Sequence, residues 1–141
     1  MRIFFASVFS VLLILVAPSL VATVFPGQGS ASAQEDLSQH WDGLWQVEGS
    51  LFQIRVAVED NVMKVTQVES MGFEWTSKDG EIEGNVVRVE VEYAGITGIV
   101  QAELIDANTG VAIAATCTPE FMVVCALSKN RQAVFRKIAE N

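Results

Sequence analysis

The sequence contains little of the side-chain chemistry on which most catalytic and metal sites depend. Its 141 residues include one histidine, His40, and two cysteines, Cys117 and Cys125. These are too few for the usual His- and Cys-rich metal centres, and His40 is the one imidazole that could activate a serine nucleophile. A Gly-x-Ser-x-Gly elbow is also missing. We therefore expect no metal, no cofactor and no enzymatic activity.

Basic residues and turn-forming residues are scarce as well. Lys and Arg number 9 against 17 Asp and Glu, which gives a formal net charge of −8. Binding to a phosphate backbone depends on clustered positive charge, so we expect no nucleic-acid partner. The 3 Pro and 10 Gly, in a chain that is 50% hydrophobic, exclude collagen-like and disordered Pro-rich classes.

The N-terminal 33 residues carry a long apolar run. Arg2 precedes an uncharged stretch from Ile3 to Phe25, and the small-residue tripeptide Ala31-Ser32-Ala33 precedes the acidic pair Glu35-Asp36. A basic start, an apolar stretch and an A-x-A site are typical of a secretory signal peptide. We therefore predict an N-terminal signal helix within a signal peptide 1–33, with cleavage after Ala33 and a protein that is periplasmic or secreted.

The same apolar run supports an alternative. Residues 3–25 are long enough to cross the ~30 Å hydrocarbon core of a bilayer. Without cleavage they would anchor the protein in the inner membrane with its domain facing the periplasm. The protein would then be an accessory subunit of a larger envelope complex. Contact with a membrane is expected only if the leader stays uncleaved.

Residues 34–141 are predicted to form a single, acidic domain. All 17 acidic residues lie in this part. Apolar and polar residues alternate through much of it, which is the period of a half-buried β-strand. Turn residues separate the alternating runs, and no gap is long enough for a crossover helix. The predicted strands are residues 43–48, 51–59, 62–69, 72–77, 81–83, 86–94, 97–106, 111–117, 121–128 and 132–138.

This spacing predicts an all-β fold, a small antiparallel up-and-down barrel of 8–9 strands in which the shortest runs join their neighbours. Two segments are ambiguous. Residues 34–41 fit either a short helical turn or a loose arm. Residues 130–140 have helical spacing at Val134 and Ile138, but we favour a final strand.

The two cysteines are predicted to form a disulfide. An even number of cysteines in an exported domain favours a structural bridge. The alternatives are a redox pair or a metal pair. Cys117 and Cys125 lack the C-x-x-C spacing of redox motifs and the companion ligands of a metal site.

One local motif carries a resemblance to known families. The segment Trp41-Asp42-Gly43-Leu44-Trp45 contains Gly-x-Trp at the start of an alternating strand. It resembles the entry strand of calycin-type barrels, which include lipocalins, avidins and small periplasmic inhibitors of bacterial metalloproteases. In those families the Trp closes the barrel floor and a basic side chain of the last strand covers it. The resemblance implies structural roles for Gly43, Trp45 and Arg136.

Aromatic side chains are the best binding candidates. Aromatic groups provide a large contact area at low entropic cost. We therefore predict that Trp41, Phe73 and Trp75 contribute to a barrel mouth or an interaction patch. Core packing is the simpler interpretation for Trp45 and Tyr93.

The polar candidates have simpler interpretations. Glu90 and Glu92 share the outward face of a predicted strand with Arg88, where carboxylates are normally solvated rather than paired as acid and base. His40 is expected to be an exposed arm residue. The sequence therefore predicts a non-catalytic periplasmic binding module for a small apolar ligand or a protein partner, with inhibition of that partner as one form of this function. The third hypothesis is a small carboxylate-dependent hydrolase.

Overall fold

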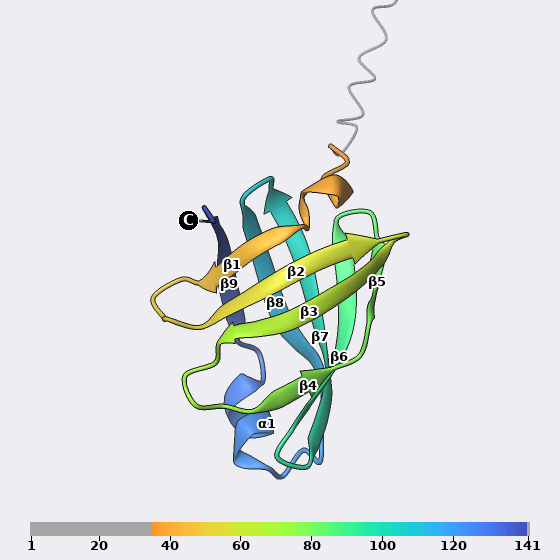
Figure 1. The fold of residues 1–141 in the computed structure, drawn as a ribbon. Coiled ribbons are helices and arrows are strands. Elements are labelled where there is room, and N and C mark those ends of the chain that lie inside the picture. The colour runs from red at the N-terminus through yellow and green to blue at the C-terminus, as the bar shows by residue number, and fades with distance from the viewer. Residues whose placement is uncertain (1–34, 141) are drawn as a thin grey trace, which may run out of the picture. The chain divides into compact units, whose positions relative to one another are not determined.

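The alternating pattern folds into antiparallel strands that close on themselves (Figure 1). The computed structural model describes residues 35–140. The elements, in order, are η1 (Ser38–His40), β1 (Gly43–Val47), β2 (Gln53–Glu59), β3 (Val62–Glu69), β4 (Trp75–Ser77), β5 (Gly80–Glu83), β6 (Val86–Tyr93), β7 (Ile96–Asp106), β8 (Thr109–Thr118), α1 (Val123–Ser128) and β9 (Gln132–Ile138). In the described part of the chain, no helix is long and apolar enough to span a membrane.

The strands form a closed barrel. Its eight members are β1, β2, β3, β5, β6, β7, β8 and β9, and each pairs antiparallel with the next. Pairing of β9 with β1 closes the ring. The structure therefore confirms the all-β fold and the small antiparallel up-and-down barrel. The predicted signal helix and its cleavage site lie outside the described residues.

The ninth strand, β4, lies beside the barrel wall and creates a seam. β4 pairs with the end of β6, and β5 pairs with its beginning, so the two act as one interrupted strand. β3 pairs with β5 at only two positions. Beyond them, Ser77 Oγ donates to the Val65 carbonyl at 3.3 Å, and Gln67 Nε2 donates to the Trp75 carbonyl. Side chains rather than a continuous ladder therefore bridge β3 and β4.

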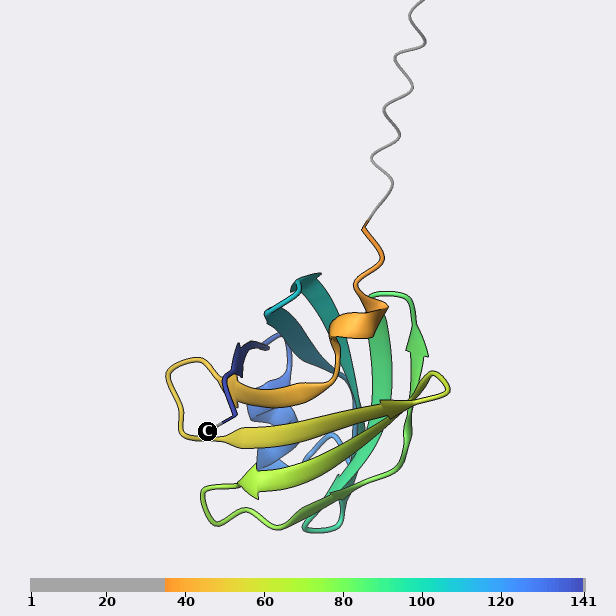
Figure 2. The ribbon, with the colours of Figure 1, turned by 45° about the horizontal axis from the view of Figure 1, so that its top comes forward.

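The 3-10 helix η1 covers one end of the barrel (Figure 2). Leu37 and Trp41, on either side of η1, are buried in the main core cluster. Asn85 fixes this segment from the β5–β6 turn: its Oδ1 accepts from the Leu37 N–H at 2.7 Å, and its Nδ2 donates to the Glu35 carbonyl at 2.9 Å. Of the two alternatives for this segment, the short helical turn is the one present, at Ser38–His40. His40 is half-buried rather than exposed.

The predicted strand 121–128 is wrong, because this segment contains the helix α1. Its apolar residues occupy both faces of the predicted strand, and such a short continuous run fits a helix as well as a strand. β8 and β9 pair directly with each other. The segment that connects them therefore cannot form a strand between them in the sheet. The favoured strand at 130–140 is confirmed as β9.

The other strand ranges differ from the predictions mainly at their ends. The largest difference is 72–77, of which only β4, Trp75–Ser77, is a strand. Met71 and Gly72 have φ values of 55° and 84°. Left-handed backbone of this kind forms a turn and cannot continue a pleated strand.

Candidate functional site

The barrel encloses an apolar cavity that opens at the end opposite η1. Its volume is about 680 Å³, and its wall consists of inward-facing side chains of the strands together with side chains of α1. The β1–β2, β3–β4, β6–β7 and β8–β9 connections surround the opening, since an up-and-down barrel places alternate connections at the same end. We call this end the mouth and the end covered by η1 the floor.

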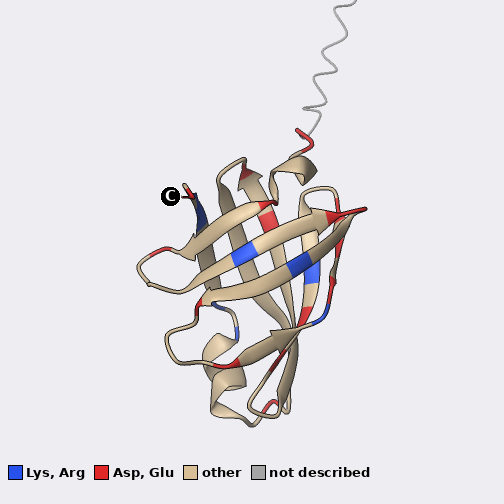
Figure 3. Cartoon of the chain, viewed as in Figure 1, with Lys and Arg blue, Asp and Glu red and all other residues tan. Residues whose placement is uncertain are grey.

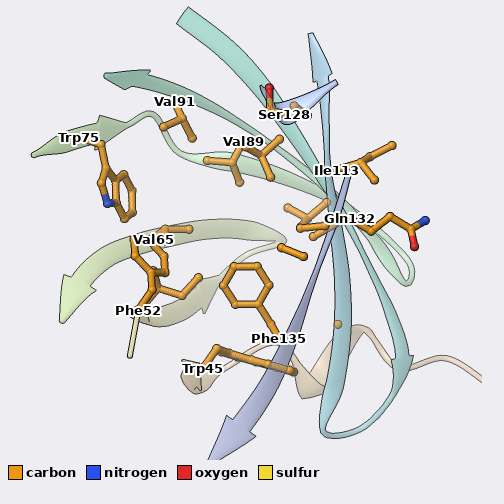
Figure 4. Close-up of a pocket in the computed structure, with 18 of the residues that line it drawn as sticks. Trp45, Phe52, Val65, Trp75, Val89, Val91, Ile113, Ser128, Gln132 and Phe135 are labelled. Carbon is orange, nitrogen blue, oxygen red and sulfur yellow. The ribbon is translucent and has the colours of Figure 1, made fainter. Parts of the chain in front are cut away.

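The floor of the cavity is aromatic and well packed. Trp45, on β1, is only 3% exposed, and its Nε1 donates to the Trp41 carbonyl at 2.8 Å. Trp41 is buried and lines the floor of the cavity. Phe135, on β9, lies next to Trp45 in the cavity wall (Figure 4). These side chains form an aromatic, hydrophobic base.

Two aromatic pairs lie near the mouth. The rings of Phe52 and Trp75 stack with centroids 6.1 Å apart and an interplanar angle of 30°. Phe73 and Tyr93 meet edge to face, with centroids 5.8 Å apart. All four line the cavity, and Phe73 is 51% exposed. Flat aromatic surfaces therefore surround the mouth of the cavity.

Polar groups are few in the cavity and lie mainly near the mouth. Ser128, Arg131 and Gln132 contribute to the wall where α1 leads into β9, and no Asp or Glu of the described chain lines the cavity. Figure 3 shows the acidic residues distributed over strands and turns around the barrel. Two indole N–H groups, those of Trp41 at the floor and Trp75 near the mouth, are buried without a hydrogen-bond partner in the described structure.

The disulfide holds α1 beside the mouth. Cys117 on β8 is bonded to Cys125 on α1, with Cα atoms 5.4 Å apart, so the predicted bridge is confirmed. Cys125 is buried, while Val124 and Leu127 of the same helix line the cavity. The bridge therefore fixes a helix that contributes to the cavity wall.

Exposed apolar side chains gather around the mouth. We call this group the apolar rim, and its members lie in the β1–β2 connection, at the end of β3, in the β3–β4 connection and in or beside α1. They are Leu51, Val68, Met71, Phe73, Phe121, Val123, Val124 and Leu127. Ile105 and Ile113 are the other large apolar side chains that are exposed in the described chain. The rim is thus a local feature of one end.

The three predicted binding residues lie at two ends of the same cavity. Phe73 and Trp75 lie near the mouth, whereas Trp41 is buried at the floor beneath η1. Sequence reasoning missed Phe52 and Arg131 as cavity residues. Phe52 begins an alternating run, which could have indicated an inward position. Arg131 follows α1. Because residues 121–128 were predicted to be a strand rather than a helix, its position at the mouth was not expected.

The predicted role of Arg136 is wrong, because Lys137 covers Trp45. The Lys137 Nζ lies 5.0 Å from the centre of the Trp45 ring. The two residues are register partners across β1 and β9, so their side chains share a face. Arg136 points to the other face, where it donates to Glu48 Oε2 and to Thr109 Oγ1, each at 2.8 Å.

Gly43 has the backbone that its predicted structural role requires. Its φ of +133° is a value that residues with a side chain rarely adopt. A Cβ atom there would lie 3.4 Å from Lys137 Cε. Burial lowers the pKa of Lys137, and the nearby Asp42 carboxylate opposes this shift. Lys137 also donates to the His40 carbonyl.

The carboxylates considered for catalysis lie away from the cavity. Glu90 forms an ion pair with Lys78 at 2.7 Å, which raises the pKa of Lys78. Glu92 is exposed, and neither residue lines the cavity. Within residues 35–140, no group of three or more His, Cys, Asp or Glu side chains is arranged to hold a metal ion.

The cavity has an apolar wall with few polar groups. Its wall combines extended apolar surface with a few polar groups near the opening, a common composition of small-molecule sites. Comparisons with protein-family models, curated proteins and solved structures gave no match to this chain.

Proposed function

We propose that this domain is a non-catalytic, exported binding module that takes a small apolar ligand into its barrel. The observation that carries this proposal is the open apolar cavity of about 680 Å³. Small-molecule pockets typically measure roughly 300–1,000 Å³ and have mainly hydrophobic and aromatic walls. Aromatic pairs near the mouth and buried Trp45 at the floor match this description.

Export to the bacterial periplasm is part of the proposal. The disulfide Cys117–Cys125 supports it, since such bonds persist in oxidising compartments. The signal-peptide pattern of residues 1–33 supports it independently. The intact mass of protein purified from the envelope tests it. A chain starting at Gln34 is expected, whereas a full-length chain extracted only from membranes would favour the anchored accessory subunit.

We also infer a calycin-like architecture. The closed barrel of eight antiparallel strands is compatible with it. Buried Trp45 on the first strand, with the cation of Lys137 on the last strand over its ring, supports the relationship. The cation lies one position beyond the residue that the resemblance implied.

A second candidate function is the binding of a protein partner, including inhibition of an enzyme. The apolar rim favours it, because exposed apolar side chains that gather at one end of a domain often mark interaction sites. The carboxylate-dependent hydrolase gains no such support, since Glu90 and Glu92 do not line the cavity.

Binding of a neutral fluorescent probe tests the ligand-binding proposal. N-phenyl-1-naphthylamine fluoresces strongly when it enters an apolar site, and we expect saturable binding to the purified domain. Ala114 lines the cavity on β8, so Ala114→Phe is expected to lower the affinity at least about ten-fold by filling the site. Ala115, its exposed neighbour, does not line the cavity. Ala115→Phe is therefore the matched control.

The two variants separate cavity binding from adsorption to the surface. Equal loss of affinity in Ala114→Phe and Ala115→Phe, or no saturable binding by the wild-type domain, would overturn the proposal. Circular dichroism spectra of all three proteins should coincide. Failure of probe binding with retained capture of one specific protein through the apolar rim would favour the second candidate.

A further inference from the structure

We propose that the cavity selects an amphiphile with an apolar tail and an anionic head, and that Arg131 recognises the head at the mouth. This inference rests on the proposed ligand-binding function and adds the chemical class of the ligand. It assigns a specificity role to Arg131, which lies in the connection between α1 and β9.

The first observation is the charge of the cavity wall. The chain has 17 Asp and Glu, yet Arg131 is the one charged residue among those that line the cavity. None of the ion pairs among residues 35–140 involves Arg131. Its guanidinium presents a planar set of donors that suits a carboxylate or phosphate group. The site therefore favours an anion locally, although the protein as a whole is acidic.

The second observation is the character of the wall opposite Arg131. Trp75 Nε1 is buried and presents no surface to the cavity, and the Trp75 ring stacks on Phe52. This side of the mouth therefore offers apolar contact, and Arg131 is the charged group that can meet an anionic head.

The third observation is where these groups lie along the barrel. Trp75 pairs with Tyr93, the last residue of β6, and Arg131 immediately precedes β9. Both positions are therefore near the mouth. The deeper wall contains apolar residues, including Trp45, Val87 and Phe135. In Figure 4, Trp75 lies on one side of the cavity and Gln132, next to Arg131 in sequence, on the other. A ligand would place its tail at the floor and its head at the mouth.

Matched ligands that differ only in the head test this inference. Dodecanoate, monododecyl phosphate and 1-dodecanol are used to displace N-phenyl-1-naphthylamine from the wild-type domain, Arg131→Gln and Lys129→Gln. Lys129 is the matched control, because it is an exposed cation two residues away that does not line the cavity. Arg131→Gln is expected to weaken binding of the two anions about five-fold relative to dodecanol, the effect of one partly exposed ion pair. Lys129→Gln should leave the ratio unchanged.

Trp75→Phe is a second control, because it keeps an aromatic ring beside Phe52. We expect it to leave the anion-to-alcohol ratio unchanged, since the buried Trp75 Nε1 presents no surface to a ligand. In Arg131→Gln, weaker binding of dodecanoate alone would identify a carboxylate as the preferred head, and weaker binding of the phosphate alone would identify a phosphate.

The outcomes distinguish this inference from the function on which it depends. Normal binding of the neutral probe, combined with an unchanged anion-to-alcohol ratio in Arg131→Gln, would overturn the head-group assignment and leave apolar ligand binding in place. An equal change in Lys129→Gln would also overturn it, because the effect would then be one of net charge. Absence of probe binding by the wild-type domain would overturn both proposals.

Discussion

The ammonium group of Lys137 lies 5.0 Å from the centre of the Trp45 indole ring, across the pairing of the last strand with the first. Lys137 also donates to the carbonyl of His40, the last residue of η1. Its alkyl chain passes close to Gly43, where β1 begins. One side chain thus connects the helix that covers the floor with the two strands whose pairing closes the barrel.

Truncation of Trp45 is expected to destabilise the barrel strongly. Trp45→Ala removes a side chain that is 3% exposed and donates to the Trp41 carbonyl. Loss of a buried Trp typically costs about 3–5 kcal/mol. Urea denaturation would measure the change in the free energy of unfolding. Phe121→Ala is the control, because Phe121 is 84% exposed. If Trp45→Ala lowers the free energy of unfolding by less than about 1 kcal/mol, the assigned role of Trp45 is contradicted.

The pH dependence of stability should report the environment of Lys137. Burial lowers its pKa from the ordinary value of 10.5. The unfolded chain therefore holds this proton over a pH range in which the folded chain has lost it, so the stability contributed by this group increases as pH rises toward 10.5. Free energies of unfolding are compared for wild type and Lys137→Met between neutral pH and that value.

The difference in stability, wild type minus Lys137→Met, is expected to rise with pH. A difference that falls with pH would show that the contact with the Trp45 ring, which favours the charged ammonium, outweighs burial. Arg136→Met serves as the control, since Arg136 points to the outer face and pairs with Glu48. The difference in the free energy of unfolding between wild type and Arg136→Met should not change with pH over the same range.

The alternation of apolar and polar residues was enough to predict most strands of the barrel, because a half-buried strand must alternate such residues. The same rule failed at 121–128, where both faces are apolar and the segment folds into α1. The choice of Arg136 as the cation over Trp45 came from the family resemblance and was wrong by one residue. Strand residues one position apart point to opposite faces, so a register shift of one residue changes which cation meets Trp45.

The cavity was beyond sequence reasoning for a different reason. A barrel of eight strands can be filled by its side chains or can hold a ligand, and the choice depends on how residues from several strands meet. Small residues such as Gly110 and Ala114 lie in the same wall as Trp75 and Phe135. Their separation in sequence gives no indication of the space between them. Arg131 became a candidate only when α1 placed it at the mouth.

Loss of the disulfide is expected to weaken the domain without unfolding it. A bridge between Cys117 and Cys125 closes a short loop, and its removal should cost about 2–3 kcal/mol in the chain-entropy model. The Cys117→Ala/Cys125→Ala variant should keep its β-type circular dichroism spectrum and lose thermal stability. Because α1 lines the mouth, the affinity of this variant for N-phenyl-1-naphthylamine should also fall. Complete loss of the β signal would show that the bridge is required for the barrel itself.

Two glycines of neighbouring strands should respond oppositely to the same substitution. A Cβ atom on Gly98 of β7 would lie 2.6 Å from the Thr116 carbonyl oxygen of β8, too close for the paired strands to keep their spacing. Gly98→Ala is therefore expected to cost about 1–3 kcal/mol. On Gly110 of β8, the nearest atom would be the Glu103 carbonyl oxygen at 3.7 Å, an ordinary contact. Gly110→Ala should then raise stability by about 0.5 kcal/mol, since alanine restricts the unfolded chain more than glycine does. Urea denaturation of both variants measures the contrast, and equal effects would contradict the register of β7 and β8.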